Sequence, residues 1–314
     1  MNDLQKYLVD ETVGEYVDGR MTRREMLRRI GLITGGTLTA GVLAGIVAAC
    51  APAAQAPPPT PTPAPTPTPA PPARGVTVPP GDPGIQTQKV EVPGQDVRLQ
   101  AYLAYPRAPG VYSGSLVIHE NRGLTEHIMD VCRRLAKEGY AALSVDLVSR
   151  EGGTDKYASD PGQVPGILGR TSADVLLKDL NTGYAYLETQ PFVRRERISV
   201  VGFCFGGGLT WRLITVNQKL AAAVAFYGPS PAVESVPNIK TPALGIYASD
   251  DPFVNPRIPA LEDALKREGK TFEIMTYAGT RHAFHNDTGA NYNAEAARQA
   301  WTRTLAWFQK YLKD

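Results

Sequence analysis

From about residue 84 to the end of the chain, apolar and polar positions follow two alternating patterns. Residues 97–105 alternate apolar and polar side chains, which predicts a strand, and residues 89–92 are its candidate partner. Short apolar runs predict further strands at 115–119, 141–145, 197–201, 221–226, 243–247 and 272–277. Helical spacing of apolar positions predicts helices over 126–138, 173–188 and 295–311, and another that begins near Gly207.

Strands and helices that alternate in this way indicate an α/β fold, with a mostly parallel central sheet and helices on both faces. Ligand sites of such sheets lie at the carboxyl ends of the strands, so the residues that follow each strand are the candidates for chemistry. The polar, glycine-rich stretch 152–171 has no clear periodicity, and we expect it to be a mobile cover of that edge.

The first 50 residues have the features of a targeting signal. Thr22-Arg23-Arg24-Glu25-Met26-Leu27-Arg28 resembles a twin-arginine export signal, and a mildly apolar run follows from Ile30 to Ala49. The run ends in Val47-Ala48-Ala49-Cys50, which resembles a lipobox whose cysteine is lipidated and becomes the first mature residue. About 20 apolar residues could instead stay as a membrane anchor, and ordinary cleavage is a third alternative. All three place the rest of the chain outside the cytoplasm, at the cell envelope.

Composition changes sharply after this signal. Residues 51–73 are almost entirely Pro, Ala and Thr and hold 11 of the 27 prolines. Such a stretch cannot build a core and favours polyproline II. The chain therefore divides into a signal or membrane anchor (1–50), a Pro/Ala/Thr-rich linker (51–83) and one folded domain (84–314).

Composition also excludes several classes of protein. Hydrophobic residues make up 43% and charged residues 20%, as in ordinary globular domains, and a net charge of +2 does not indicate a nucleic-acid binder. Cys50, Cys132 and Cys204 are too few and too far apart for a disulfide framework. The four histidines form no zinc-type spacing, and we expect no metal or cofactor.

A candidate nucleophile follows the strand predicted at 197–201. Gly202-Phe203-Cys204-Phe205-Gly206 opens the next helix, in the pattern of a nucleophile elbow with Cys in place of Ser. The helix N-terminus favours a thiolate, and its backbone N–H groups can receive an oxyanion. The alternative is a structural cysteine in a glycine-rich turn. Cys132, on the apolar face of the helix at 126–138, is expected to be such a core residue.

The partners of a nucleophile in such an elbow follow it in chain order, first an acid and then a histidine. Asp250 and Asp251 follow the strand at 243–247, and turn chemistry alone would explain one of them. His282 follows the last strand and is predicted to be the base that raises the thiolate fraction of Cys204. His285 is expected to support the site from behind or to lie on the surface.

Glu120 follows the strand at 115–119, in the loop that gives the second oxyanion N–H in this type of fold. From the residues alone it is either a carboxylate near the thiol or a solvated loop residue. His119, Glu120 and His127 lie on different predicted elements without ligand spacing, which argues against a metal site.

These residues resemble the dienelactone hydrolase (carboxymethylenebutenolidase) family from about Val90 to Leu312. The strings that carry the resemblance are Val117-Ile118-His119-Glu120-Asn121-Arg122-Gly123-Leu124, Gly139-Tyr140-Ala141-Ala142, Asp146-Leu147, Gly202-Phe203-Cys204-Phe205-Gly206-Gly207, Asp251-Pro252-Phe253-Val254 and His282-Ala283-Phe284.

The resemblance implies an α/β-hydrolase fold and a Cys-His-Asp triad at Cys204, His282 and Asp251. Asp251 is preferred to Asp250 because it has the family's spacing to the following Val. The resemblance also implies that Glu120 helps to ionise the thiol and that Arg150, after the strand at 141–145, binds a substrate carboxylate.

One position departs from the family pattern. Asn286 stands where the family has a second carboxylate-binding arginine, and Arg122 and Arg281 are candidates to compensate. This departure and the export signal argue against dienelactone itself as the substrate.

The sequence therefore predicts a metal-independent hydrolase of carboxylic esters or lactones that works through an acyl-enzyme. Cys204 attacks the carbonyl, and the N–H groups of Phe205 and Asn121 stabilise the oxyanion. A thioesterase or acyl transferase on the same scaffold is one alternative, and a surface lipoprotein that binds a ligand without turnover is another. We expect a monomer, held at the membrane by a lipid on Cys50 or by the apolar run, with a small-molecule substrate and no nucleic-acid partner.

Overall fold

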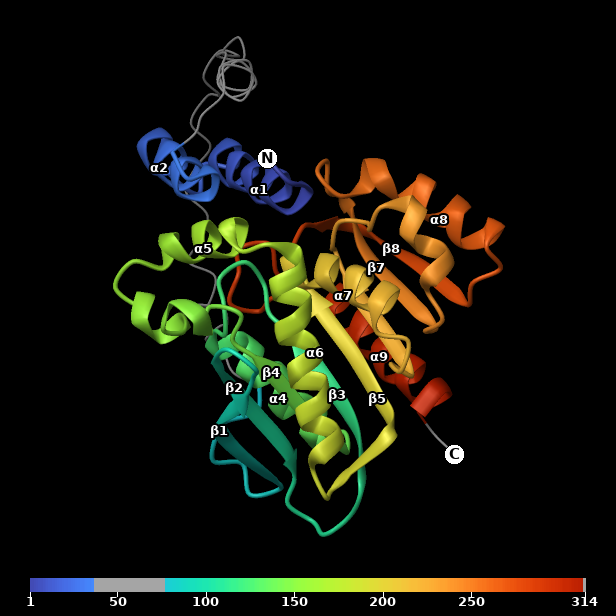
Figure 1. The fold of residues 1–314 in the computed structure, drawn as a ribbon. Coiled ribbons are helices and arrows are strands. Elements are labelled where there is room, and N and C mark those ends of the chain that lie inside the picture. The colour runs from blue at the N-terminus through green and yellow to red at the C-terminus, as the bar shows by residue number, and fades with distance from the viewer. Residues whose placement is uncertain (37–76, 313–314) are drawn as a thin grey trace, which may run out of the picture.

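The fold is known from a computed structural model, which describes residues 1–36 and 77–312. Eight strands form a single sheet in the order β1-β2-β4-β3-β5-β6-β7-β8 (Figure 1). β1 pairs antiparallel with β2 and β2 with β4, and every other neighbouring pair is parallel. The strands are β1 (Ile85–Pro93), β2 (Arg98–Pro106), β3 (Tyr112–Ile118), β4 (Tyr140–Val145), β5 (Val193–Phe203), β6 (Ala222–Phe226), β7 (Ala243–Asp250) and β8 (Phe272–Arg281).

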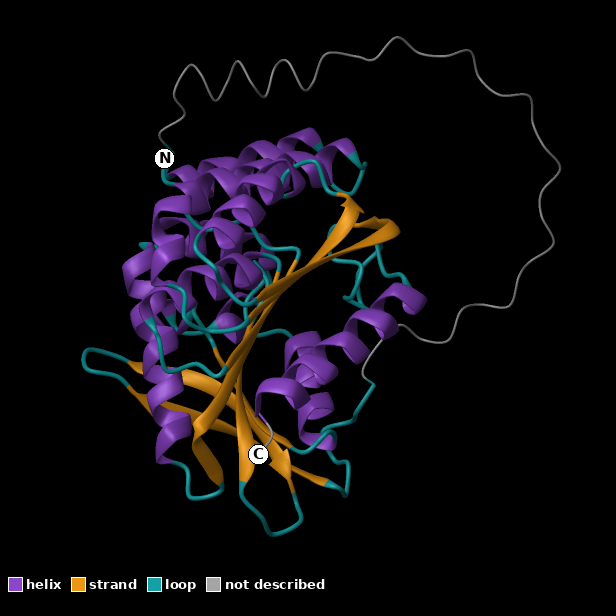
Figure 2. Cartoon of the chain, turned by 90° about the vertical axis from the view of Figure 1, so that its right-hand side faces the viewer, coloured by secondary structure: helices purple, strands orange, loops and turns teal. Residues whose placement is uncertain are grey.

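Helices cover both faces of this sheet, as Figure 2 shows with the sheet seen nearly on edge. α6 and α7 pack on one face, and α4 and α9 pack on the other. The α-helices that alternate with the strands are α4 (Glu126–Lys137), α5 (Val164–Arg170), α6 (Ala173–Thr189), α7 (Phe205–Val216), α8 (Ile258–Arg267) and α9 (Ala294–Leu312). The expected α/β architecture is therefore confirmed, including a partner strand at residues 89–92, which lies within β1.

The burial of the central strands explains why their apolar runs could be recognised in the sequence. Every residue of β4 and of β6 is buried, because helices cover the sheet on both sides. The apolar pattern did not predict α8, which the structure shows at Ile258–Arg267. The stretch 152–171 differs from the irregular cover that was expected: it holds two 3-10 helices, Thr154–Tyr157 and Pro161–Gln163, followed by α5. A helix of seven residues with two glycines is too short to show a period.

The first residues of the chain form two further helices, α1 (Asp3–Val17) and α2 (Arg23–Thr34), which we call the N-terminal hairpin. Asn2 caps α1 in a capping box with Gln5. The hairpin lies at the top of the molecule in Figure 1, and α2 packs on α5. Its apolar side is buried, with exposed fractions of 5% or less at Leu4, Tyr7, Leu8, Val9, Met26, Ile30 and Ile33.

The hairpin includes most of the predicted export motif. Arg23 and Arg24 are exposed at the start of α2, while Arg28 forms a paired contact with Asp160. Cys50, most of the apolar run and residues 51–76 of the linker lie outside the described residues, so the signal and lipid anchor stay predictions. Within residues 1–36 and 77–312, no helix is long and apolar enough to cross a membrane.

Candidate active site

Cys204 stands at the junction of β5 and α7, in a backbone conformation that few residues adopt. Its φ of 57° and ψ of −119° mark a strained turn between Phe203, the last residue of β5, and Phe205, the first of α7. A Cβ atom on Gly206 would lie 2.4 Å from the carbonyl oxygen of Ile118, which explains why glycine is required there. The local prediction of an elbow after a buried strand matches this geometry.

Asp251 and His282 come together from the ends of two other strands. Asp251 follows β7 and is buried, and His282 follows β8. The Nδ1 atom of His282 lies 2.6 Å from Oδ2 of Asp251, within hydrogen-bond distance. Burial alone would lower the pKa of His282, but the carboxylate of Asp251 outweighs it and holds that pKa well above its usual value. Asp250 points elsewhere and faces Arg281 at 3.5 Å.

The imidazole and the thiol are near neighbours. A ring nitrogen of His282, Sγ of Cys204 and a carboxylate oxygen of Glu11 all lie within 4.8 Å of one another. Burial, and next the nearby Glu11, raise the pKa of the Cys204 thiol to about 12, while His282 acts in the opposite direction. The thiol is therefore in its neutral form in this arrangement.

Glu120 lines the same pocket as Cys204. Its Oε2 atom accepts a hydrogen bond of 2.6 Å from Nδ2 of Asn286, and its Oε1 atom is buried without a partner among the described residues. Asn286 thus holds Glu120 in place. Glu120 is buried and lines the pocket together with Cys204, so it is not a solvated loop residue.

Two further predicted residues lie beside the elbow. Phe205 is the first residue of α7, so its N–H group has no acceptor within the helix. Asn121 follows β3 and lines the same pocket as Cys204. Their positions are compatible with an oxyanion site.

Arg150 lies away from this pocket. Its guanidinium forms a two-point contact with Asp179, with distances of 2.9 and 2.7 Å, and also reaches Asp96 at 3.2 Å. The structure does not bring it together with Cys204, so its predicted contact with a substrate carboxylate finds no support in this geometry. Sequence order alone could not show that acidic residues of α6 and of the β1–β2 turn would pair with it.

The N-terminal hairpin contributes side chains that sequence reasoning missed. The hydroxyl of Tyr7 lies 3.3 Å from Sγ of Cys204 and 3.3 Å from Nε2 of His282. The thiol of Cys204 donates to Oε1 of Glu11 over 3.3 Å, and burial raises the pKa of Glu11 to about 7. The spacing of Leu4, Tyr7 and Leu8 is typical of a helix. The interpretation of residues 1–50 as a targeting segment left this helix unpredicted.

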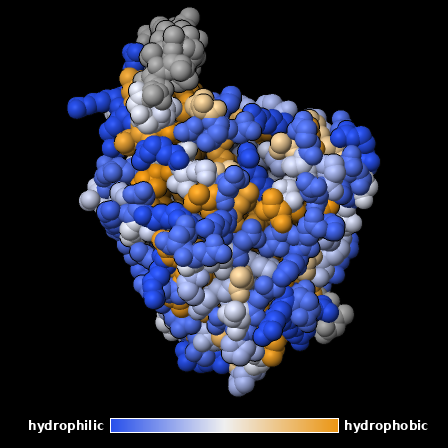
Figure 3. All heavy atoms as spheres, viewed as in Figure 1, coloured by the Kyte–Doolittle hydropathy of each residue, from blue (hydrophilic) through white to orange (hydrophobic). Residues whose placement is uncertain are grey.

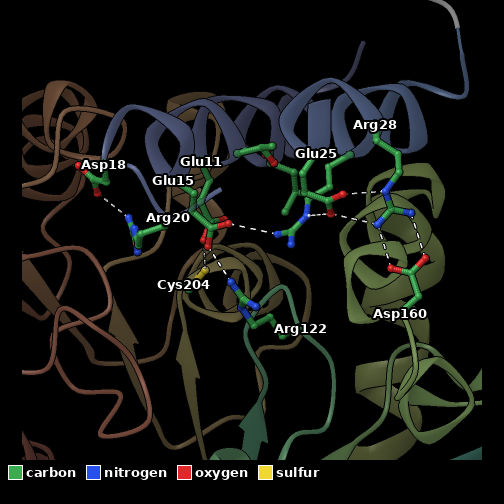
Figure 4. Close-up of polar contacts among 12 residues, drawn as sticks. Glu11, Glu15, Asp18, Arg20, Glu25, Arg28, Arg122, Asp160 and Cys204 are labelled. Carbon is green, nitrogen blue, oxygen red and sulfur yellow. Dashed lines mark hydrogen bonds and ion pairs between the residues drawn. The ribbon is translucent and has the colours of Figure 1, made fainter. Parts of the chain in front are cut away.

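The resulting pocket has a volume of about 560 Å³, which suits a small molecule. The elbow, the Asp251 and His282 loops and the hairpin form its walls. Arg122 and Arg281 also line it, and Figure 4 shows Arg122 reaching up to Glu15 beside Glu11 and Cys204.

The donor atoms of Glu11, Cys204 and His282 are types that Zn²⁺ accepts. Hydrogen bonds among these groups and to Tyr7 already account for their positions without an ion. His119 and His127 do not join them: Nε2 of His119 accepts from the N–H of Leu147, and Nδ1 of His127 contacts Asp287. His285 is buried, and burial lowers its pKa well below the usual value.

The mostly parallel sheet, the strained turn at Cys204 and the contact between Asp251 and His282 define an α/β-hydrolase. Residues 99–312 match the dienelactone hydrolase family, and the chain belongs to that family.

Relatives cover most of the chain. A "Putative carboxymethylenebutenolidase" of Methylorubrum extorquens is 33% identical over 239 residues, which cover 73% of this chain and 82% of the relative. One of Saccharolobus solfataricus is 34% identical over 251 residues, 69% of this chain and 95% of the relative. The crystal structure of a "Putative Dienelactone Hydrolase" from Klebsiella pneumoniae is 33% identical with a TM-score of 0.67, and covers 72% of this chain and 99% of that one. The chain is accordingly a hydrolase that acts on ester or lactone substrates.

Proposed function

We propose that this hydrolase cleaves carboxylic esters or lactones with Cys204 as nucleophile, His282 as base and Asp251 as the residue that orients His282. The observation that carries the proposal is the 2.6 Å contact between Asp251 and Nδ1 of His282, with Cys204 on the other side of the ring. This contact leaves Nε2 as the nitrogen that exchanges a proton with the thiol.

The reaction follows from these positions. Nε2 of His282 takes the thiol proton, and Sγ of Cys204 attacks the carbonyl carbon. The N–H groups of Phe205 and Asn121 stabilise the negative oxygen. The adduct collapses to a thioester, and His282 returns its proton to the leaving oxygen. Water, deprotonated by His282, then releases the acid and regenerates the thiol.

Glu120 is proposed to tune the thiol, as in the resembled family. Its buried carboxylate is one of the charges that raise the pKa of Cys204. Movement of Glu120 away from the thiol would favour the thiolate.

The preferred substrates are activated. A thiolate leaves a tetrahedral adduct more readily than an ordinary alkoxide does, so an unactivated ester would tend to revert. Enol esters and strained lactones have better leaving groups and therefore suit a cysteine nucleophile.

The test is hydrolysis of p-nitrophenyl esters and a panel of lactones by the full chain. Loss of kcat/KM in both Cys204→Ala and His282→Ala supports the mechanism. Equal activity of Cys204→Ala and the unmodified chain would refute it. Faster turnover of acyl thioesters than of all esters would favour a thioesterase instead.

We also propose that residues 1–50 direct the chain to the cell envelope, where it is anchored as a monomer. The support is the twin-arginine string and the lipobox-like end at Cys50. In cells that express the chain, radioactive palmitate should label the exported protein but not the Cys50→Ala variant. Labelling of both, or of neither, would argue against a lipid on that cysteine.

A further inference from the structure

The N-terminal hairpin contacts the reacting atoms themselves. Tyr7 and Glu11 lie on successive turns of α1. The hydroxyl of Tyr7 and Oε1 of Glu11 each lie 3.3 Å from Sγ of Cys204. With both in place, Cys204 is only 2% exposed. A carbonyl carbon that approaches the thiol would need the space that these two side chains hold.

The same contacts keep the thiol and the base out of their reactive forms. The Glu11 carboxylate accepts the thiol hydrogen bond, which stabilises S–H over a thiolate. His282 lies between the carboxylates of Asp251, at 2.6 Å, and Glu11, at 3.9 Å. Two carboxylates favour the cationic imidazole, which cannot accept the thiol proton.

A row of acidic residues fixes α1 over the pocket. Glu11, Glu15 and Asp18 are spaced so that they share one side of α1 and its C-terminal end. Glu15 accepts from Arg122 over 2.8 Å (Figure 4). Asp18 accepts from Arg281. Arg122 and Arg281, which line the pocket, thus form ion pairs with the hairpin.

The hairpin is anchored away from the thiol. Leu32 of α2 lies against Gly166 of α5, where an added Cβ would come within 2.7 Å of it. Ile33 is fully buried and lies near Gly169. Apolar residues show along the face just below the two helices in Figure 3. Docking can therefore be weakened at α2 without touching any residue of the elbow.

We propose that the N-terminal hairpin is an intramolecular inhibitor of the site, in which Tyr7 and Glu11 keep Cys204 as a covered, neutral thiol until the hairpin is displaced. This inference rests on the proposed role of Cys204 as nucleophile. Displacement exposes the thiol, removes one carboxylate from His282 and frees Arg122 and Arg281.

The first experiment measures how fast iodoacetamide alkylates Cys204 in the full chain, with the modified peptide identified by mass spectrometry. Ile33→Asp places a carboxylate in the buried contact with α5 and should undock the hairpin. It is expected to speed alkylation of Cys204 about tenfold or more. The control is Gly31→Ala on the same helix, where an added Cβ meets nothing within 4 Å, and it should react like the unmodified chain.

A second pair of variants changes the capping contacts and leaves the hairpin docked. Glu11→Gln removes the charge that faces the thiol with little change in shape, and is expected to speed alkylation about tenfold. Tyr7→Phe removes the hydroxyl shared by Cys204 and His282, and is expected to give a smaller increase. These variants keep the proposal testable if Ile33→Asp does not fold, which thermal melting will show.

Ester hydrolysis decides whether the hairpin inhibits or assists. Faster hydrolysis by Ile33→Asp supports inhibition. Slower hydrolysis together with faster alkylation would show that the hairpin is a required wall, and would overturn the proposal. So would equal alkylation of Ile33→Asp, Glu11→Gln and the unmodified chain. Full activity of Cys204→Ala would instead refute the nucleophile, while the alkylation rates would still report on the hairpin.

Discussion

Gly206→Ala tests whether the elbow positions the thiol. A Cβ on Gly206 would lie 2.4 Å from the carbonyl oxygen of Ile118 and 2.5 Å from that of His119, about 1 Å closer than an ordinary contact of 3.4 Å. Both are backbone atoms in or next to β3, so no rotamer change can relieve the overlap. Either β3 or the first turn of α7 has to move, and Cys204 moves with it.

The size of this effect follows from the overlap. Overpacking of this kind costs about 1–3 kcal/mol, which in a domain of this size lowers Tm by about 2–12 °C. A displacement of about 1 Å at the nucleophile is expected to reduce kcat/KM roughly 100-fold. Thermal melting and hydrolysis of p-nitrophenyl acetate measure the two effects separately. Gly81→Ala, where nothing lies within 4 Å, is the matched control. Unchanged Tm and activity in Gly206→Ala would refute this account of the elbow.

Three further predictions concern the buried polar groups. Asp251→Asn should lower kcat about 10⁴-fold with little change in Tm, because the amide no longer holds His282 in the required tautomer; near-normal turnover would contradict the triad. Asn286→Leu should cost about 1–3 kcal/mol in chemical denaturation, since it leaves Glu120 without its hydrogen bond, and an unchanged midpoint would count against that contact. The pKa of Glu11 is raised to about 7 in the docked hairpin, so docking is strongest below the pKa of a free carboxyl and weakens by up to about 3 kcal/mol as pH rises to 7 and above. Hydrogen exchange of α1, corrected for the intrinsic rate, should therefore increase from pH 5 to pH 8, and Glu11→Gln should remove that dependence.

Several features of the site could be predicted because they depend on local sequence and on a general topological rule. The elbow at Cys204 is a local pattern, a buried strand followed by glycines and a helix. Asp251 and His282 were found because parallel strands bring their carboxyl ends to one edge of the sheet, whatever the details of side-chain contacts. Choosing Asp251 over Asp250 needed the family resemblance. Of the two, Asp251 lies within hydrogen-bond distance of His282, whereas Asp250 faces Arg281.

The sequence by itself thus determined the α/β-hydrolase domain, the elbow and the residues that follow its strands. Only the tertiary structure decided that Arg150 pairs with Asp179, that Glu120 is held by Asn286, and that α1 reaches the thiol. Tyr7 and Cys204 are 197 positions apart, and no periodicity or local motif specifies such a contact. It depends on how the hairpin buries its apolar side against α5 and on which charges then meet across the pocket, and both are properties of the folded surface.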